Sequence, residues 1–170
     1  MRDDPYDLPE DMSLTLQPVG VMRSPYRVHE GTPRQPAAAA EMGVEADGVI
    51  VLKQGLQNLV RDLRGFSHVW VLFWFNYSRG WRHTVKPPRD TEHRGLYATR
   101  APHRPNPIGL SLVELKHVEG RTLTVGAHDI LDGSPILDIK PYVPYADVAP
   151  QARAGWVDEL DTPPVGDEQT

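Results

Sequence analysis

A stiff, cationic bend at residues 104–111, RPNPIGLS, has the composition of a binding loop. Each proline fixes its own φ and removes an amide donor, and the residue before it is held extended, so the bend is rigid before any ligand arrives. A rigid loop loses less entropy on binding. Asn106 offers an amide with donor and acceptor faces, and Gly109 allows the close approach of a ligand or another backbone. The segment predicts either one wall of a binding site or a stiff turn that only sets strand register.

Carboxylates gather in a second segment, HDILDGSPILDIKPY, at residues 128–142. Asp129, Asp132 and Asp138 lie close together there, around a turn marked by glycine and proline. Their spacing does not match an EF-hand, so we predict no metal site. A carboxylate at a strand end instead accepts hydrogen bonds from a ribose or from a cationic ligand. For Asp132, a self-capping Asx turn is a strong alternative explanation.

A third loop, GTPRQP at residues 31–36, repeats the style of the other two, with prolines, a glycine, one cation and one amide. Binding sites tend to assemble from several loops on a rigid scaffold. The similar composition of the three loops therefore predicts that they form one common site.

Positive charge is concentrated in residues 79–104, although the chain has a net charge of −5. This segment holds only two acidic residues, and its cations are Arg79, Arg82, Lys86, Arg89, Arg94, Arg100 and Arg104. Much of the compensating negative charge lies in the two termini. The segment predicts either a solvated loop or a surface for phosphates.

Length and composition indicate one globular domain with short tails. The chain has 170 residues, 39% of them hydrophobic and 24% charged, which is typical of a folded protein. It has no cysteine, which excludes disulfides and thiolate metal sites. The longest apolar run, residues 69–75, is too short to span a bilayer, and the acidic N-terminus lacks the apolar segment of a secretory signal. We therefore predict a cytoplasmic protein with no membrane partner.

Strands dominate the predicted elements that must position these loops. Residues 56–63 have the apolar spacing of one short amphipathic helix, residues 66–75 predict a strand buried on both faces, and residues 23–40 and 77–95 predict long loops. The remaining predicted strands are residues 14–22, 48–53, 95–99, 108–118, 122–127 and 136–143. In residues 108–118, apolar Leu110, Leu112, Val113 and Leu115 are interleaved with polar Ser111, Glu114 and Lys116.

No βαβ alternation and no GxGxxG fingerprint occurs, which argues against a Rossmann cofactor site. The fold class is therefore mostly β: a small β-barrel with one or two short helices and long Pro-rich loops. We predict an acidic N-terminal tail at residues 1–13, the barrel domain at 14–147, and a Pro- and acid-rich tail at 148–170.

Six motifs in one order closely resemble the TsaA-like family, also called tRNA methyltransferase O: PVGVMRSPY, GTPRQP, FSHVWVLFWF, WRHTVKPPR, ATR…RPNPIGLSLVEL and DILDGSPILDIKPYVPYAD. The resemblance covers roughly residues 16–147. It implies a small β-barrel that binds S-adenosylmethionine and works as a homodimer, with the cofactor near the subunit interface. The implied reaction is methylation of N6 of threonylcarbamoyladenosine at position 37, beside the anticodon of a threonine tRNA.

The resemblance also implies site residues, carried over by motif. The cofactor contacts are Pro33, Arg34, Gln35, Asn76, Tyr77, Arg100, Leu110, Gly126, Ala127, His128, Asp129 and Ile130. Asn76-Tyr77 stands where some members have a His-Gln pair. The RNA contacts are Arg79, Arg82, Lys86, Arg89, Arg94 and Arg104, with Trp81 or Tyr77 available to stack on an extruded base.

The implied acceptor needs help from the protein. Its N6 carries a carbamoyl group, which makes the N–H more acidic and the lone pair less nucleophilic, so a base would assist. The candidates by position are the catalytic residues Asp129, Asp132 and His128. The threonyl carboxylate of the modified base needs a cation, which Arg34, Arg100 or Arg104 could provide. Two alternatives stay open: the same barrel methylating another RNA or a small molecule, and a non-catalytic adaptor that binds S-adenosylmethionine.

Overall fold

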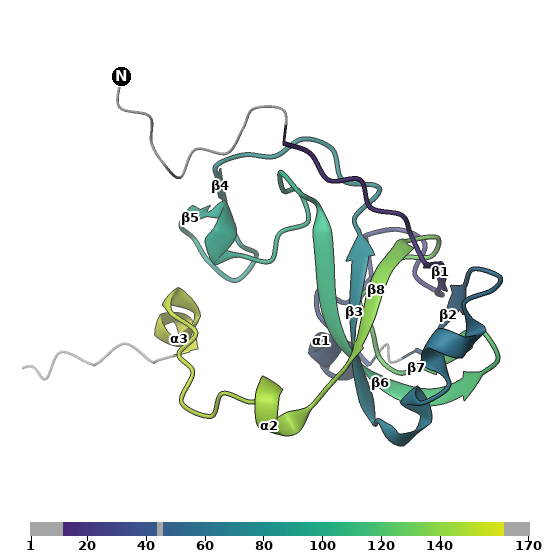
Figure 1. Cartoon of the computed structure of the whole chain (residues 1–170). Helices are drawn as coiled ribbons and strands as arrows, with labels where there is room; N and C mark the ends of the chain where they lie inside the picture. Colours follow the sequence, from purple (N-terminus) through teal and green to yellow (C-terminus); the bar gives the residue numbers. More distant parts are fainter. Residues whose placement is uncertain (1–11, 44–45, 162–170) are drawn as a thin grey trace, which may run out of the picture.

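Six strands form a closed antiparallel barrel in the computed structural model, which describes residues 12–43 and 46–161 (Figure 1). The strands are β1 (Gly20–Arg23), β2 (Gly48–Leu52), β3 (His68–Trp74), β6 (Ile108–Glu119), β7 (Thr122–Val125) and β8 (Pro135–Pro141). Their order around the barrel is β1-β2-β7-β6-β3-β8, and the pairing of β8 with β1 closes it. The predicted fold class is confirmed.

The barrel interior is filled by alternate residues of the strands, as the period of two requires. In β2 these are Gly48, Ile50 and Leu52. Gly48 is needed where it stands, because a Cβ there would lie 2.2 Å from the Met22 side chain and 2.6 Å from Nε2 of His128. The interior is thus packed to the backbone at this point.

In β6, the inward face is the opposite of the one that hydropathy favours in the first half of the strand. Gly109, Ser111 and Val113 are buried, whereas Leu110 is 55% exposed. Position 109 faces the Phe73 ring, and only glycine fits there because a Cβ would lie 2.3 Å from that ring. Ser111 can face inward because its hydroxyl has a hydrogen-bond partner in Asp129. A register shift after Leu115 then changes the phase of the strand.

The prediction that the strand over residues 66–75 is buried on both faces is wrong for this chain. The inner face of β3 is buried, but Trp74 on the outer face is 45% exposed. Trp74 pairs with Ile108 and Leu72 with Leu110, so the exposed outer residues of β6 continue the same apolar surface. We refer to Leu72, Trp74, Ile108 and Leu110 as the outer apolar face.

Three local predictions before β3 also differ from the structure. The first strand begins at Gly20 rather than residue 14, because Pro18 has no amide donor and Leu14 is 81% exposed. The predicted loop over residues 23–40 ends in α1 (Pro36–Met42), whose alanines have the highest helix propensity. The predicted amphipathic helix forms instead as two 3-10 turns, η1 (Gln57–Val60) and η2 (Leu63–Gly65).

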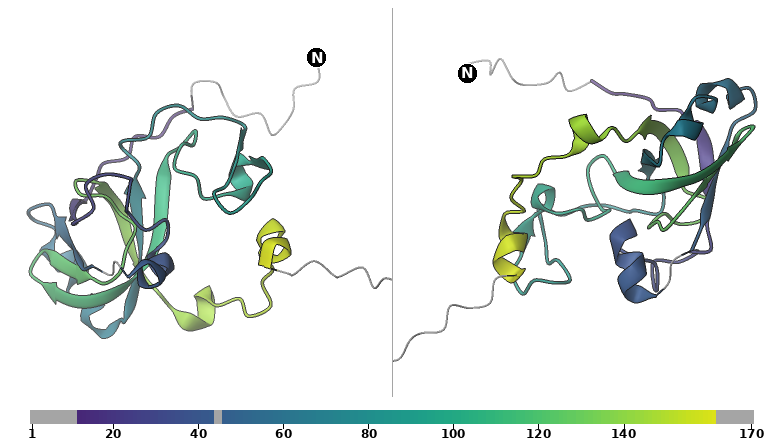
Figure 2. Two further views of the ribbon diagram at one scale, coloured as in Figure 1. Left: turned by 180° about the vertical axis from the view of Figure 1, so that it is seen from behind. Right: turned by 90° about the horizontal axis from the view of Figure 1, so that it is seen from below.

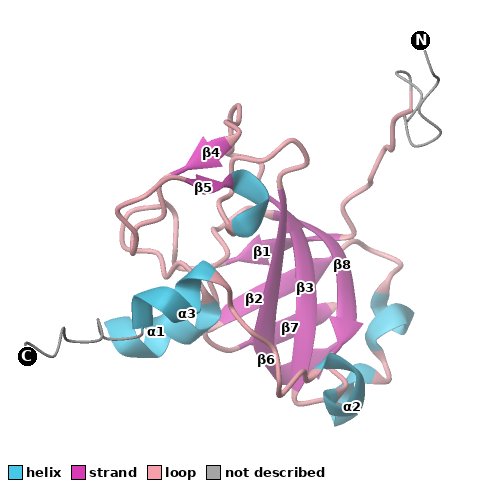
Figure 3. Cartoon of the chain, turned by 90° about the vertical axis from the view of Figure 1, so that its left-hand side faces the viewer, coloured by secondary structure: helices cyan, strands magenta, loops and turns pink. Residues whose placement is uncertain are grey.

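The long segment between β3 and β6 folds into a small module beside the barrel. β4 (Thr84–Val85) and β5 (Arg94–Gly95) form a separate two-stranded sheet, and η3 (Leu96–Ala98) follows directly. Figure 3 shows this sheet standing off the barrel strands. The predicted strand over residues 95–99 is wrong, because the Leu96 carbonyl accepts hydrogen bonds from both the amide and the hydroxyl of Thr99, which closes a turn.

The chain leaves the barrel through α2 (Pro144–Asp147) and then runs to α3 (Trp156–Asp161). The three views in Figures 1 and 2 place α3 next to the β4–β5 module, which it contacts through Trp156. The predicted tail over residues 148–170 therefore contains a helix that contacts the rest of the chain. Residues 1–11 of the predicted N-terminal tail lie outside the described residues. In the described ranges, no helix combines the length and apolarity needed to span a membrane.

Candidate functional site

Gln35, Arg100 and Asp129 come from three separate loops and lie together in the structure. Nη1 of Arg100 donates to Oε1 of Gln35 at 3.5 Å. The charge of Arg100 also acts on the carboxyl of Asp129. These residues belong to the loop before α1, the loop after η3 and the loop after β7. The prediction that several stiff loops share one site is consistent with this convergence.

Asp129 is placed by the strand it runs beside. The loop after β7 continues along β6, where the Gly126 amide donates to the Glu114 carbonyl at 2.9 Å. The Ser111 hydroxyl then donates to Oδ1 of Asp129 at 2.5 Å. Burial raises the pKa of Asp129 to about 6, although the Ser111 hydrogen bond and the charge of Arg100 both act to lower it. A carboxyl with this pKa exchanges protons near neutral pH.

The proline-rich bend is held by its own arginine. Nη1 of Arg104 donates to the carbonyls of Thr99 at 2.9 Å and Ala101 at 3.2 Å. The same guanidinium lies 5.3 Å from the ring centroid of Tyr97, which is 76% exposed. Arg104 was predicted to contact RNA; its Nη1 is used within the bend, which gives this nitrogen a bracing role.

Asn76 and Tyr77 lie beside the bend and reach the loop after β7. The next residue, Ser78, donates its hydroxyl to the Pro102 carbonyl at 3.1 Å. The Tyr77 hydroxyl donates to the Asp132 carbonyl at 3.5 Å. Oδ1 of Asn76 is buried and has no hydrogen-bond partner among the described residues. This oxygen is a buried acceptor whose hydrogen bond is not made within the described residues.

His128, predicted as both a cofactor contact and a catalytic candidate, has a fully buried side chain. Its Nδ1 accepts from the Ile130 amide at 3.2 Å, and Tyr26 packs edge-on against the ring with centroids 5.0 Å apart. Burial lowers its pKa to about 4, against the opposing charge of Asp47. The imidazole is therefore neutral and cannot reach a substrate, so the geometry leaves only its backbone for ligand contacts.

Asp132 joins two distant parts of the chain. Its Oδ1 accepts from the Ser24 amide at 3.1 Å, and its own amide donates to the Tyr26 carbonyl at 2.7 Å. These bonds fasten the loop before β8 to the segment after β1. The carboxylate has a structural function here, and the geometry favours Asp129 over Asp132 as the catalytic candidate.

The other predicted cofactor residues are distributed around this centre. Pro33 is buried, whereas Arg34 is exposed and lines a cavity of about 440 Å³ with His29, Thr32 and others. Leu110 belongs to the outer apolar face. Gly126, Ala127 and Ile130 lie in the loop that carries Asp129. The structure brings no cluster of three or more potential metal ligands together within residues 12–43 and 46–161.

The predicted RNA-binding residues divide into two groups. The exposed ones are Arg79, Arg82, Lys86 and Arg89. Arg79 donates from Nη1 to two carbonyls of its own segment, Asn76 and Ser78, at 3.1 Å. Arg94 instead forms an ion pair with Asp90 at 2.6 Å and is 25% exposed, which argues against a primary role in phosphate contact.

Residues 21–148 match the profile of the tRNA-methyltransferase O N-terminal domain. The chain belongs to this family. The resemblance inferred from the six motifs is thereby confirmed.

Relatives of the family agree with this assignment. The chain is 42% identical over 152 residues to the tRNA (adenine(37)-N6)-methyltransferase of Escherichia coli strain K12, covering 85% of this chain and 64% of that protein. It is 38% identical over 140 residues to an S-adenosyl-L-methionine-binding protein of Archaeoglobus fulgidus, covering 81% and 96%. The crystal structure of TrmO from Pseudomonas aeruginosa superposes with a TM-score of 0.73 at 38% identity, covering 86% of this chain and 64% of that one. The chain thus spans less than two thirds of the E. coli relative and of the crystallised TrmO.

Sequence analysis missed one residue of the candidate site, Ser111, and one tryptophan that contacts the neighbouring segment, Trp156. Ser111 was treated only as a polar position of a strand, and its inward orientation follows from Gly109 facing Phe73, a contact that no sequence pattern reveals. Trp156 lay in a segment predicted to be a tail. A tryptophan in a polar tail was the available signal, since large aromatic residues are usually packed.

Proposed function

We propose that this protein of the tRNA-methyltransferase O family transfers a methyl group from S-adenosylmethionine to N6 of adenosine 37 in a tRNA. The names of its relatives in E. coli and in Mus musculus, both tRNA (adenine(37)-N6)-methyltransferases, support the reaction and the acceptor. The name of the Archaeoglobus relative supports the cofactor. The motif resemblance specifies threonylcarbamoyladenosine as the modified base. Because the acceptor is a tRNA, we place the activity in the cytoplasm.

The residues around Asp129 fit S-adenosylmethionine, which supplies a methyl group on a positively charged sulfur. Arg100 suits the carboxylate of the methionine part, because a guanidinium pairs with it bidentately. The buried Oδ1 of Asn76 suits an N–H donor. The exposed Leu110 and Tyr77 offer apolar surface for the adenine. The donor set, the orphaned acceptor and the apolar flank match the parts of this cofactor.

Positioning supplies much of the acceleration in a displacement at a methyl group, and the stiff bend provides it. Transfer forms a bond from N6 to the methyl carbon, breaks the bond from that carbon to sulfur, and releases the N6 proton. Asp129, with its pKa raised to about 6, is the group that takes this proton. Ser111 holds the accepting carboxylate in one orientation through its 2.5 Å hydrogen bond.

The module between β3 and β6 is the proposed RNA footprint. Its exposed cations Arg82, Lys86 and Arg89 suit phosphates of the anticodon stem and loop. Trp81, 48% exposed in the same segment, suits stacking with an extruded base.

A second copy of this chain is the proposed occupant of the outer apolar face. Leu72, Trp74, Ile108 and Leu110 form a continuous apolar surface on paired strands, and such surfaces on folded proteins mark interaction sites. Family resemblance supplies the identity of the partner. Leu110 lies on this face and among the predicted cofactor contacts, which supports a cofactor bound near the subunit interface.

The observation that carries the proposal is the convergence of Arg100, Gln35 and Asp129 from three separate loops. Transfer of labelled methyl groups to tRNA tests it. We expect incorporation into tRNA from a strain that lacks the enzyme and contains threonylcarbamoyladenosine. Incorporation that does not require threonylcarbamoyl indicates a different acceptor, and cofactor binding without transfer to any RNA indicates an adaptor.

A further inference from the structure

The β4–β5 module has little of its own to hold it in place. Its two strands are two residues long each and pair only with each other. A two-stranded sheet of this size is marginal without packing from another element. Figures 1 and 3 show the module beside the barrel, not within it. Something outside the barrel sheet must fix its position.

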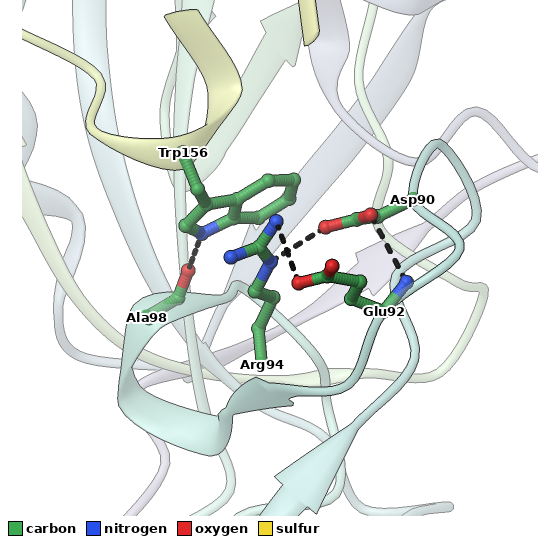
Figure 4. Close-up of polar contacts among 5 residues, drawn as sticks. All are labelled: Asp90, Glu92, Arg94, Ala98 and Trp156. Carbon is green, nitrogen blue, oxygen red and sulfur yellow. Dashed lines mark hydrogen bonds and ion pairs between the residues drawn. The ribbon is translucent and has the colours of Figure 1, made fainter. Parts of the chain in front are cut away.

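Trp156, the first residue of α3, contacts this module at two points. Its indole Nε1 donates to the Ala98 carbonyl at 2.9 Å, across 58 positions of sequence. Its ring lies over Arg94, with the guanidinium carbon 5.3 Å from the ring centroid. Figure 4 shows the indole stacked over the guanidinium, with the Ala98 carbonyl beside the indole nitrogen.

The edge of the Arg94 guanidinium is paired with two acidic residues. Nε donates to Asp90 at 2.6 Å, and Nη2 lies 3.5 Å from Glu92 (Figure 4). Asp90 is only 7% exposed, and the hydrogen bond from Arg94 holds its pKa below the usual range. The guanidinium is thus 25% exposed and is held by Asp90 at its edge and by the Trp156 ring over its face, and reduced contact with water strengthens a cation–π interaction.

Ala98 is joined to the candidate site by a short, rigid path. Thr99 is fixed to the preceding turn by its 3.1 Å amide bond to the Leu96 carbonyl. Arg104 then clamps the Thr99 carbonyl, and Arg100 follows directly in sequence. A contact that fixes Ala98 therefore also fixes the backbone position from which the Arg100 side chain extends.

We propose that residues 148–161 act as a clasp in which Trp156 is a positioning residue for Arg100 and for the basic module. This inference rests on the proposed function, because Arg100 is assigned to the cofactor and the module to RNA. The clasp holds both by one aromatic side chain, so it couples the placement of the cofactor site to that of the RNA footprint.

A different role for α3 makes the opposite prediction. The helix carries Asp158 and Glu159, and the charge of Glu159 acts on Arg94. An acidic helix that screens a basic module would weaken RNA binding, and its removal would strengthen it. The specific indole hydrogen bond and the guanidinium held against the indole ring favour the clasp over simple screening.

Three variants of the full chain test the clasp. Trp156→Ala removes both contacts. Trp156→Phe keeps a ring over Arg94 and removes the N–H donor. Tyr145→Ala is the matched control, because it removes a 93% exposed aromatic side chain from α2 of the same C-terminal segment. Each variant is assayed for its melting temperature, S-adenosylmethionine affinity, kcat and KM for tRNA, and hydrogen exchange of residues 84–100.

We expect Trp156→Ala to weaken S-adenosylmethionine binding about threefold to tenfold, to raise KM for tRNA, and to speed exchange in residues 84–100, with kcat retained at saturation. Trp156→Phe should restore part of each effect, and Tyr145→Ala should leave all of them unchanged. General destabilisation would instead lower kcat without changing KM. Unchanged cofactor affinity and exchange in Trp156→Ala, or tighter tRNA binding, would overturn the clasp. If the unaltered protein binds no S-adenosylmethionine, the proposed function fails, while exchange still decides whether the clasp exists.

Discussion

The Ser111 hydroxyl donates a 2.5 Å hydrogen bond to the Asp129 carboxylate from the inner face of a barrel strand. Burial raises the pKa of Asp129, and this hydrogen bond opposes the rise. Ser111 therefore increases the ionised fraction of Asp129 near neutral pH. This pair links the interior of the barrel to the proposed chemistry.

The pH dependence of turnover should report on Asp129. Since the ionised carboxylate takes the proton, kcat should rise with pH through about 6 and level off above it. Ser111→Ala removes a hydrogen bond that lowers the pKa, so the rising limb should move to higher pH. Ser67→Ala, which removes a serine bonded to His68, is the control and should leave the profile in place. A profile that does not move in Ser111→Ala contradicts the assignment.

Asp129→Asn should lower kcat about 100-fold or more, the usual contribution of a general base. Because an asparagine side chain has the same shape, the barrel should stay folded. Single-turnover transfer to tRNA measures the effect. Activity within a few-fold of the unaltered protein would show that Asp129 is not the base.

Asp129 and His128 should have opposite effects on stability between about pH 4 and 6. Because the pKa of Asp129 is raised in the folded state, its contribution to the free energy of unfolding is full below pH 3.8. This contribution is lost as the pH rises through about 6. Because the pKa of His128 is lowered in the folded state, its contribution to the free energy of unfolding is full above pH 6.5. This contribution is lost as the pH falls through about 4. Each amounts to at most roughly 3 kcal/mol, so the two largely offset each other in the unaltered protein.

Asp129→Asn should uncouple these two contributions. At pH 7 the variant should be more stable than the unaltered protein by up to roughly 3 kcal/mol, with no difference below pH 4. Urea unfolding of both proteins at a series of pH values gives the difference directly. A difference that stays constant from pH 3.5 to 7 contradicts the raised pKa of Asp129.

Arg100→Ala should weaken S-adenosylmethionine binding about tenfold to a hundredfold, because it removes a charge-assisted hydrogen bond. Arg100→Lys keeps the charge and loses the planar fork, so it should recover only part of the affinity. Arg61→Ala, at a surface arginine paired with Asp62, is the matched control. Calorimetry measures the affinity of each variant for S-adenosylmethionine. An unchanged affinity in Arg100→Ala would show that Arg100 does not belong to the cofactor site.

Neutralising Arg82 and Lys86 should weaken tRNA binding and flatten its salt dependence. Each lost phosphate contact reduces the slope of log K against log salt by about 0.7 to 0.9. The matched double variant replaces Arg61 and Arg64, two exposed arginines near η1 and η2. An unaltered slope in the Arg82 and Lys86 variant would show that the module is not the RNA footprint.

Ile108→Glu should convert a dimer into monomers, because it places a charge in the outer apolar face. Leu59→Glu changes a leucine that is 73% exposed in η1 and should not affect assembly. Sedimentation equilibrium of both variants gives the oligomeric state. A protein that is monomeric without any substitution would contradict the proposed interface.

The fold class followed from the sequence because the strands of the barrel carry their own hydrophobic pattern. β2 and β7 form almost where they were predicted, and each alternates strictly between buried and half-buried residues. The predicted strand over residues 95–99 failed because the Leu96 carbonyl is bonded by both the amide and the hydroxyl of Thr99, which closes a turn after the Leu96 amide pairs with the distant His83 carbonyl. A pattern of side chains does not encode such a backbone contact.

The candidate site was partly predictable because some of its loops have a distinctive amino-acid composition. The loops around Gln35 and Asp129 were identifiable because Pro, Gly and polar residues mark rigid binding loops, whereas Arg100 was implied by the family resemblance. The inward side chain of Ser111 was not, since the phase of β6 is set by Gly109 against Phe73. Nor was Trp156, whose partners Arg94 and Ala98 are remote in sequence.

Calorimetric titration of the pure protein with S-adenosylmethionine and S-adenosylhomocysteine tests the central claim most directly. The arrangement of Arg100, Asn76 and Asp129 predicts saturable binding of both compounds at about one per chain. Binding of neither compound would contradict the assignment of this site to a methyl donor, and the proline-rich bend would then be only a turn that sets the register of β6.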